Sequence, residues 1–413
     1  MRVALLTNAL TAYILPVYRD LAATPGWRLR LLLSTQTEPH WGDAWLQAYE
    51  EGLSSLDVEL VRSLRFERRQ LVERSSGVEQ SVSVHLPWGT ISALRRFRPD
   101  VVVSAELGAR SLLAAAWTRW NRVPLVLWSY PSRVSGDVSS SARQGMRRRL
   151  LARADAVIGM GVQAREALRG FGVPDERIFD APSSHDAPGF ERALSGMEPL
   201  VARHALRGAA RARERVALVA GRLVPVKGIL PLLAAWARLP ESLRARWTLC
   251  FVGDGPLAHA VRDAQRARPG EIALLPGLPA SEMPAIHAAA DLHIFASLGD
   301  TWGIVVNEAL ACGVPVLCSR LAGCADDLIE PGRNGWLFDP TDAAGFGEAL
   351  RTALASDALE RMGVAASDTA KRFGPEAMAG GMRRAIDYAL ARRTDAYTAS
   401  RRASAGPSAY RSS

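Results

Sequence analysis

The sequence predicts an α/β protein made of two doubly wound domains, each a parallel sheet with helices on both faces. Its 413 residues exceed what one hydrophobic core usually organises. In both halves, short apolar runs rich in aliphatic residues alternate with helical stretches, which is typical of parallel sheets. The polar, arginine-rich stretch 193–215 contains no such run and separates the two series.

Apolar runs mark the expected strands in order along the chain. They are 2–7, 29–34, 100–105, 124–129 and 156–160 in the first half, and 216–221, 247–253, 272–277, 292–297 and 314–319 in the second. The first run leads into Pro16 without a small-residue cleavage site, so we interpret it as a strand and not a signal peptide. We expect domains at 1–195 and 196–393, with the final helix able to pack back on the first domain. The stretch 394–413 has too little apolar content to repay the entropy of ordering, which predicts a disordered tail.

The composition favours a cytoplasmic protein with an anionic partner. The net charge of +9 suits a nucleic acid, a membrane surface or a phosphate-bearing ligand. Since we find no nucleic-acid-binding motif, we expect no nucleic-acid partner. The longest apolar runs, such as 112–117, fall short of the ~18 residues that a transmembrane helix needs. The cysteines lack the spacing of metal-binding pairs, which predicts free thiols in a reducing compartment. They are Cys250, Cys312, Cys318 and Cys324.

Lysine is almost absent from this chain, which makes Lys227 informative. Of 51 basic residues, only Lys227 and Lys371 are lysines. Lys227 lies in the stretch GRLVPVKG (221–228), which leaves an expected strand and precedes an expected helix. Doubly wound sheets bind ligands at such places, and helix N-termini favour anions. A compact ammonium reaches between phosphate oxygens where a guanidinium does not fit. Gly221 allows a tight backbone, and we predict that Arg222 and Lys227 clamp a diphosphate. The alternative is that both are solvated loop charges.

Two further glycine turns follow strands of the second half. Gly253 and Asp254 lie in VGDGP, and Gly277 ends the next run, so that the backbone can approach a nucleotide at each turn.

The stretch DTWGIVVNEALACGVPV places two carboxylates, Asp300 and Glu308, beside a glycine and one run of helix. A helix beginning near Gly303 would point the amides of Ile304 and Val305 into the cleft. One carboxylate would accept hydrogen bonds from sugar hydroxyls and the other from a ribose diol.

The chain resembles glycosyltransferase family 4, the retaining nucleotide-sugar enzymes of the GT-B fold. The resemblance lies in the order and spacing of three stretches: GRLVPVKG, VGDGP and DTWGIVVNEALACGVPV. The resemblance is strong over roughly 215–340. It implies two Rossmann-like domains facing a central cleft, the first binding the acceptor and the second the nucleotide-sugar. It also implies that Arg222 and Lys227 bind the donor diphosphate and Glu308 the ribose. Asp300 replaces the first of the family's two glutamates, near the donor sugar.

The first half resembles the family less closely. In APSSHDAPGF, Asp186 and Phe190 keep the spacing of a family segment, while Ser184 or its neighbour replaces an asparagine. The glycine pair that many members carry after their first strand is missing from TNALTAYILPVYRDLAA.

The histidine that many members place near the reacting sugar is also missing. The expected strand ends offer Glu106, Tyr130 and Arg133 instead, and Glu106 is a candidate catalytic helper. We interpret His85 as a surface or core residue.

Catalysis would consist mainly of charge stabilisation. Negative charge grows on the departing nucleoside diphosphate, and preorganised Arg222, Lys227 and helix-terminal amides would stabilise it. We therefore expect no metal and no cofactor besides the donor. The acidic ADD at 325–327 is interpreted as a helix cap. In the family's chemistry the departing phosphate can take the acceptor's proton, so a protein base is not required.

The favoured function is a glycosyltransferase, specifically a hexosyltransferase, that acts on a glycan or lipid-linked glycan precursor in cell-surface polysaccharide synthesis. The stretch 141–156 carries five arginines and reads either as an interfacial helix at the inner face of the membrane or as a solvated domain face. The alternatives are a GT-B phosphorylase, which would need Lys371 as a Schiff-base lysine, a sugar-nucleotide epimerase, or a non-catalytic scaffold. The scaffold alternative is disfavoured, because the chain keeps the residues that would bind the donor: Arg222, Lys227 and Glu308.

Overall fold

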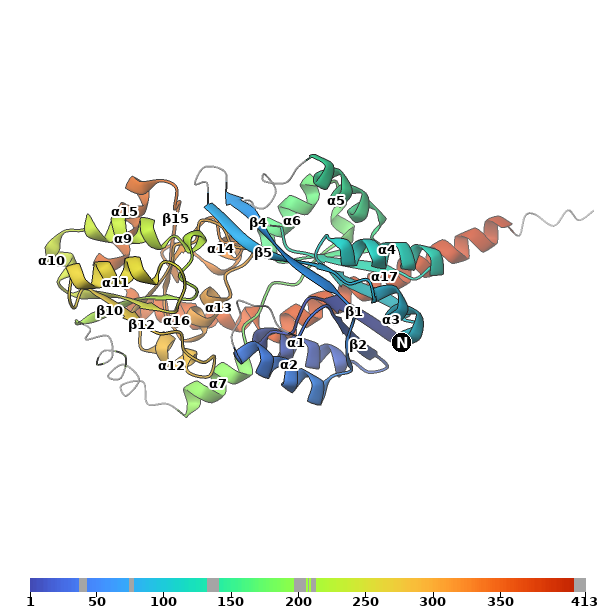
Figure 1. Cartoon of the computed structure of the whole chain (residues 1–413), viewed down its shortest axis with the longest axis horizontal. Helices are drawn as coiled ribbons and strands as arrows, with labels where there is room; N and C mark the ends of the chain where they lie inside the picture. The colour runs from blue at the N-terminus through green and yellow to red at the C-terminus, as the bar shows by residue number, and fades with distance from the viewer. Residues whose placement is uncertain are drawn as a thin grey trace, which may run out of the picture.

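The computed structural model describes residues 1–36, 43–73, 78–131, 141–196, 206, 208 and 213–404. It confirms two parallel sheets flanked by helices, one in each half of the chain (Figure 1). The chain crosses once from the first domain to the second and returns through its last helix.

The first domain is built on a parallel sheet of seven strands in the order β3-β2-β1-β6-β7-β8-β9. The order reverses between β1 and β6, so loops that leave these two strands diverge and open a crevice at their carboxyl ends. The strands are β1 (Arg2–Thr7), β2 (Arg28–Leu33), β3 (Val58–Leu60), β6 (Val101–Ala105), β7 (Leu125–Ser129), β8 (Ala156–Gly159) and β9 (Ile178–Asp180).

The second domain has a parallel sheet of six strands in the order β12-β11-β10-β13-β14-β15, with the reversal between β10 and β13. Trp236, Trp247 and Phe251 are fully buried in its core. The strands are β10 (Arg215–Ala220), β11 (Trp247–Val252), β12 (Ile272–Leu275), β13 (Leu292–Phe295), β14 (Val316–Ser319) and β15 (Gly335–Phe338).

Helices cover both sheets, because each crossover between parallel strands returns through a helix. The α-helices are α1 (Leu15–Ala22), α2 (Asp43–Ser55), α3 (Thr90–Phe97), α4 (Ala109–Asn121), α5 (Ser141–Arg153), α6 (Gly161–Gly170), α7 (Ala187–Ser195), α9 (Ile229–Ala237), α10 (Glu241–Arg244), α11 (Ala258–Ala267), α12 (Met283–Ala288), α13 (Ile304–Ala311), α14 (Ala325–Leu328), α15 (Ala343–Ala355), α16 (Leu359–Ala370) and α17 (Pro375–Ser404). The 3₁₀ turns are η1 (Ala12–Ile14), η2 (Asp175–Arg177), η3 (Pro225–Lys227) and η4 (Lys371–Phe373). Within the described residues, none of these helices is long and apolar enough to cross a bilayer.

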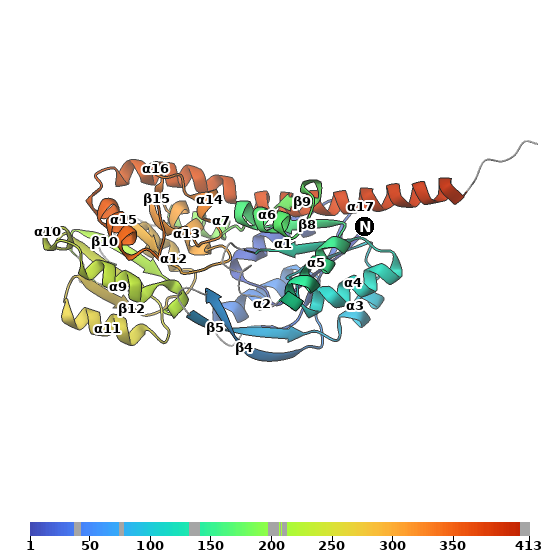
Figure 2. The same cartoon turned by 90° about the horizontal axis from the view of Figure 1, so that it is seen from above.

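Helix α17 runs from the second domain back across the first (Figure 2). It packs on α1, β8 and β9, and an ion pair of 3.1 Å joins Arg383 to Asp20. Gly381 permits the close approach, because a Cβ there would lie 2.1 Å from the carbonyl oxygen of Asp180. The helix continues to Ser404, which corrects the prediction of a disordered tail from 394: adding turns to an existing helix avoids the cost of nucleation. Residues 405–413 lie outside the described part.

The structure adds strands that the sequence analysis missed. Three of them, β3, β9 and β15, lie at sheet edges and are only three or four residues long, too short to show a continuous apolar run. The other two, β4 (Leu64–Glu73) and β5 (Val78–Leu86), form a separate antiparallel hairpin. This hairpin lies on the side of the molecule opposite α17, and β5 reaches η3 in the second domain (Figure 2).

The two domains also meet through α6 and α14. The amide of Val162 donates a 3.0 Å hydrogen bond to Asp327, and the side chain of Gln163 donates to the carbonyl of Ala322 at 2.9 Å. The ADD stretch that we interpreted as a helix cap forms the start of α14 and supplies this contact. Burial raises the pKa of Asp327 to about 6, although the bond from Val162 opposes the rise.

Replacing Asp327 with Asn should stabilise the protein above pH 6. The folded state holds the proton of Asp327 more tightly than the unfolded chain, so this residue's contribution to stability falls as pH rises from the ordinary value of 3.8 to about 6. An asparagine oxygen still accepts from Val162 but never ionises. We therefore expect the gain in melting temperature of Asp327→Asn to be small at pH 4, to grow up to pH 6 and to stay constant above it. A gain that is the same at every pH would contradict the buried charge as its cause.

Candidate functional site

The predicted diphosphate loop lies at the switch point of the second sheet, between the carboxyl ends of β10 and β13. It leaves β10 at Gly221, forms η3 and enters α9 at Ile229. Gly228 adopts a φ of 70°, and a Cβ there would lie only 1.9 Å from the carbonyl oxygen of Ala296. This close packing of η3 against the end of β13 is available only to glycine. Bonds from the amide of Leu298 and the hydroxyl of Ser297 to the carbonyl of Val226 hold the loop there.

Lys227 is paired with a carboxylate of the neighbouring strand end. Its Nζ lies 2.6 Å from Oδ2 of Asp300, and the two side chains are 25% and 18% exposed. The ammonium also lies 5.0 Å from the centre of the Phe295 ring, where a cation is favoured. Arg222 is exposed on the same loop, and both basic residues line a small pocket with Gly221. The structure thus brings together the residues predicted to bind the diphosphate.

Two more glycine turns lie beside this loop. A Cβ on Gly253 would lie 2.0 Å from the carbonyl oxygen of Gly221, and one on Gly277 would lie 3.9 Å from Cα of Gly253. At these glycines no Cβ stands above the backbone, so a flat ligand can approach it closely. Asp254 is exposed, and its carboxylate accepts a 2.7 Å bond from the amide of Gly255. This bond shapes the turn itself.

Helix α13 begins where the sequence predicts, with Gly303 before its first residue, Ile304. Its first amides, including that of Val305, give this end a partial positive charge. Glu308 follows one turn later, with a side chain 20% exposed, and its Oε2 lies 3.5 Å from Nε2 of the fully buried His287. Asn307, which precedes Glu308, donates a 3.1 Å hydrogen bond to the carbonyl of Ser183. This bond connects α13 to the segment that links the domains.

That linking segment contributes a histidine that the sequence analysis overlooked. His185 is 3% exposed; burial lowers its pKa, which the nearby carboxylate of Glu308 opposes. Two residues that match the family's spacing lie around His185. Asp186 caps α7 by accepting a hydrogen bond from the amide of Gly189, and the ring of Phe190 lies 5.3 Å from that of His185. Ser184 is fully buried. His185 stood inside the quoted motif, and its position beside Asp186 was the available signal.

The first domain supplies the opposite wall of the site at its own switch point. Glu106 follows β6 with a φ of 66°, a left-handed conformation that is strained for a residue with a side chain. Its Oε1 accepts hydrogen bonds from Asn8, at 2.8 Å, and from the hydroxyl of Tyr130, at 3.1 Å. Buried Arg110 donates to Asn8 and to the carbonyl of Ala105. Arg133 lies outside the described residues, and His85 is a buried residue of β5.

Tyr13 joins the two walls. It lies in η1, in the loop that lacks the family's glycine pair. Burial raises its pKa, and the charges of Asp300 and Glu308 raise it further. Burial likewise raises the pKa of Tyr130, with contributions from Glu106 and Tyr13. Both phenols therefore stay protonated near neutral pH, and the hydroxyl of Tyr130 donates its proton to Glu106.

The described residues include no group of three or more histidine, cysteine, aspartate or glutamate side chains placed to hold a metal ion. Along the same part of the chain the four cysteines are free; Cys250, Cys318 and Cys324 are buried and Cys312 is half-buried.

Two family models match most of the chain. Residues 8–179 match the glycosyl transferase 4-like domain, and residues 206–371 match glycosyl transferases group 1. Among curated relatives, O-antigen chain mannosyltransferase B of Escherichia coli is 28% identical over 205 residues, which are 48% of this chain and 51% of the relative. A sulfoquinovosyl transferase of Arabidopsis thaliana is 27% identical over 68% of this chain and 55% of its own length. The chain thus spans about half the length of the curated relatives that it matches.

Solved structures show the same fold at low sequence identity. Anabaena HepE in complex with UDP has a TM-score of 0.71 and 19% identity, covering 94% of this chain and 100% of that one. WaaG, a glycosyltransferase involved in lipopolysaccharide biosynthesis, has a TM-score of 0.61 and 18% identity, covering 93% and 99%.

Proposed function

Because this chain belongs to glycosyltransferase family 4 and has the GT-B fold, we propose that it is a retaining hexosyltransferase that uses a nucleotide-sugar donor. Its acceptor is a glycan or lipid-linked glycan precursor in cell-surface polysaccharide synthesis, reached from the cytoplasmic face of the membrane. The observation that carries this proposal is the loop after β10, where Arg222 and the half-buried Lys227 line one pocket with Gly221 and Lys227 pairs with Asp300.

The chemistry follows from this arrangement. Arg222, Lys227 and the first amides of α13 stabilise the negative charge that grows on the leaving diphosphate, without a metal ion or another cofactor. Glu308 accepts hydrogen bonds from the ribose, while Asp300 lies on the side of the sugar. On the opposite wall, Glu106 and its hydrogen-bonded partner Tyr130 orient the acceptor hydroxyl. The departing phosphate oxygen takes the proton from that hydroxyl as the new glycosidic bond forms.

A panel of donors tests the proposal. One relative is described as GDP-mannose-dependent and one structural neighbour is solved with UDP-glucose, so UDP-, GDP- and ADP-sugars are the appropriate set. We expect one nucleotide class to raise the melting temperature and to support sugar transfer to a glycolipid extract. Retention is read from the anomeric configuration of the product by NMR. If no nucleotide-sugar raises the melting temperature or is consumed, the donor site is assigned wrongly.

The phosphorylase alternative loses its main support in the structure. Lys371, the only other lysine, has a 74% exposed side chain that pairs with Asp368 at 2.9 Å on the surface. A lysine that forms a Schiff base must be an uncharged amine in an enclosed site. Lys371 is exposed and charged in a surface ion pair, so it does not fit this role.

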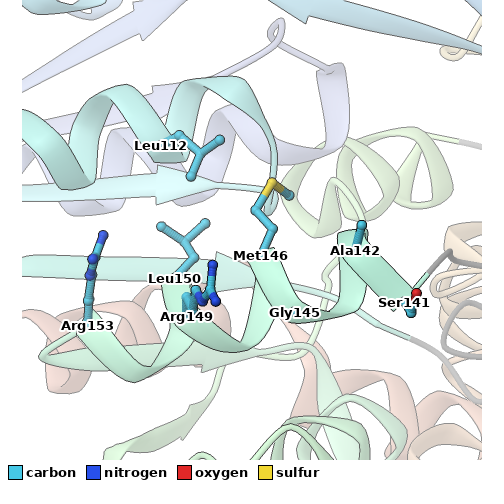
Figure 3. Close-up of a pocket in the computed structure, with 8 residues that line it drawn as sticks. All are labelled: Leu112, Ser141, Ala142, Gly145, Met146, Arg149, Leu150 and Arg153. Carbon is cyan, nitrogen blue, oxygen red and sulfur yellow. The ribbon is translucent and has the colours of Figure 1, made fainter.

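Helix α5 supports docking on an anionic membrane. It carries Arg143, Arg147, Arg148, Arg149 and Arg153 and no acidic residue. Burial lowers the pKa of Arg147, and the neighbouring charge of Arg143 lowers it further. Beside it, a groove of about 700 Å³ runs between α4 and α5 (Figure 3).

The groove combines apolar side chains with arginines. Leu112 of α4 faces Met146 and Leu150 of α5, while Arg149 and Arg153 lie along its edge (Figure 3). Apolar surface beside several cations fits the boundary between lipid headgroups and acyl chains. Because a lipid-linked acceptor has its reactive end at that boundary, docking there would bring the cleft to its substrate.

We expect the protein to cosediment with vesicles that contain anionic phospholipid and not with neutral ones. Each basic residue near such a surface contributes about 1 kcal/mol, so replacing Arg143, Arg147, Arg148 and Arg149 with Gln should abolish cosedimentation. Raising the salt concentration should release the wild-type protein, because salt screens exposed charges. Donor hydrolysis in solution should be unchanged in the variant and serves as the control for folding. If the wild-type protein does not cosediment with anionic vesicles at low salt, a soluble acceptor is indicated.

A further inference from the structure

The proposed diphosphate site contains a carboxylate of the protein itself, paired with Lys227. Oδ2 of Asp300 lies 2.6 Å from Nζ of Lys227, the position that a phosphate oxygen would take. The other carboxylate oxygen accepts a 3.2 Å bond from the amide of Trp302, which holds Asp300 in this orientation. The pair is largely shielded from water, with side chains 25% and 18% exposed, so it is screened less than a surface ion pair.

We propose that Asp300 is an internal competitor of the diphosphate: the ion pair that it forms with Lys227 is broken when the donor binds. The inference rests on the proposed function, in which Lys227 binds the diphosphate. It assigns Asp300 a second role, in discriminating between a complete nucleotide-sugar and a free nucleoside diphosphate.

The discrimination follows from what each ligand offers Asp300 after displacement. A free diphosphate takes Lys227 and leaves the carboxylate unpaired next to phosphate oxygens, which is unfavourable in a partly buried site. A nucleotide-sugar carries hydroxyls on the group attached to the terminal phosphate. With that phosphate on Lys227, these hydroxyls are placed near Asp300, because its carboxylate lies 2.6 Å from the same ammonium. The donor therefore replaces the lost ion pair with hydrogen bonds, while the nucleoside diphosphate does not.

Neighbouring groups favour such an exchange. Lys227 keeps its position over the Phe295 ring after Asp300 leaves, so the cation stays in place for the phosphate. Asp300 has a second partner, because its other carboxylate oxygen accepts from the amide of Trp302 at 3.2 Å. Burial and, to a smaller extent, the charge of Asp300 raise the pKa of Tyr13. The site thus holds a cation in a fixed position and a carboxylate with more than one possible partner.

Calorimetry on three variants tests the exchange, with UDP, GDP, ADP and inorganic pyrophosphate as probes. In Asp300→Asn we expect diphosphate and pyrophosphate to bind about tenfold more tightly, since a like charge beside the phosphate is gone. Asp300→Glu keeps the charge and should keep the weak wild-type affinity. Asp357→Asn removes an exposed carboxylate from the same domain and should change nothing. The ratio of nucleoside diphosphate to nucleotide-sugar dissociation constants should fall in Asp300→Asn alone.

The outcomes separate this inference from the proposed function. If Lys227→Ala weakens diphosphate binding while Asp300→Asn leaves it unchanged or weaker, the donor site stands and the internal competitor is refuted. If Lys227→Ala binds diphosphate and pyrophosphate as the wild type does, both the donor-site assignment and the internal competitor are refuted. Tighter binding in both Asp300→Asn and Asp300→Glu would also refute it, because the effect would then not follow the charge.

Discussion

Replacing Lys227 with Ala is expected to lower turnover by about 10²-fold or more, the usual effect of removing a preorganised donor to a developing negative charge. The ammonium is half-buried and held between Asp300 and the Phe295 ring, so no neighbouring water-exposed group can take its place without rearrangement. The substitution also leaves Asp300 without its partner, which adds repulsion of the diphosphate to the lost attraction. Steady-state transfer rates and donor affinity by calorimetry measure the effect.

The chain supplies its own control for this experiment. Lys371 is the only other lysine, and its side chain is exposed and paired with Asp368 on the surface. Lys371→Ala should therefore keep wild-type turnover. Adding Asp300→Asn to Lys227→Ala should recover part of the lost diphosphate affinity, because residues in contact do not act additively. Wild-type turnover in Lys227→Ala would show that this loop is not the diphosphate site.

The sequence predicted the parts of the fold that rest on long apolar runs. The central strands of both sheets are buried on two faces, so runs such as 100–105 and 247–253 stand out against their surroundings. The positions of Gly221, Gly253 and the start of α13 followed, because they are fixed by the ends of such strands. In contrast, the hairpin β4-β5 carries exposed residues such as Leu64 and Phe66 beside arginines, so its sequence shows no continuous apolar run.

The pairing within the site could not be predicted from the sequence. Asp300 and Lys227 are 73 positions apart, and their contact depends on η3 packing against the end of β13. From the sequence we expected Lys227 to bind the diphosphate and Asp300 to bind the sugar. The structure shows that the two side chains also form an ion pair with each other. Tyr13 and His287 were missed for a similar reason: each comes from a different segment and lies near Asp300 or Glu308 only in the folded chain. His185 was missed although it stands next to Asp186 in the stretch APSSHDAPGF.

Replacing Glu308 with Gln should raise the dissociation constant for free nucleoside diphosphate by about tenfold to a hundredfold, the range for losing a hydrogen bond to a charged group. Its carboxylate is 20% exposed, and its nearest ring neighbour, His287, is fully buried at 3.5 Å. That contact limits where the side chain can point, so the carboxylate is positioned before a ribose arrives. Gln keeps the size of the side chain but replaces one acceptor oxygen with a donor.

The ribose itself provides the control for Glu308. A 2′,3′-dideoxynucleoside diphosphate has no diol, so the wild type and Glu308→Gln should bind it with equal, weak affinity. A general disruption of α13 would instead weaken both ligands to the same extent, because Ile304 and Val305 begin the same helix. If Glu308→Gln weakens the dideoxy ligand as strongly as the ordinary one, Glu308 acts through the structure of the helix and not through the ribose.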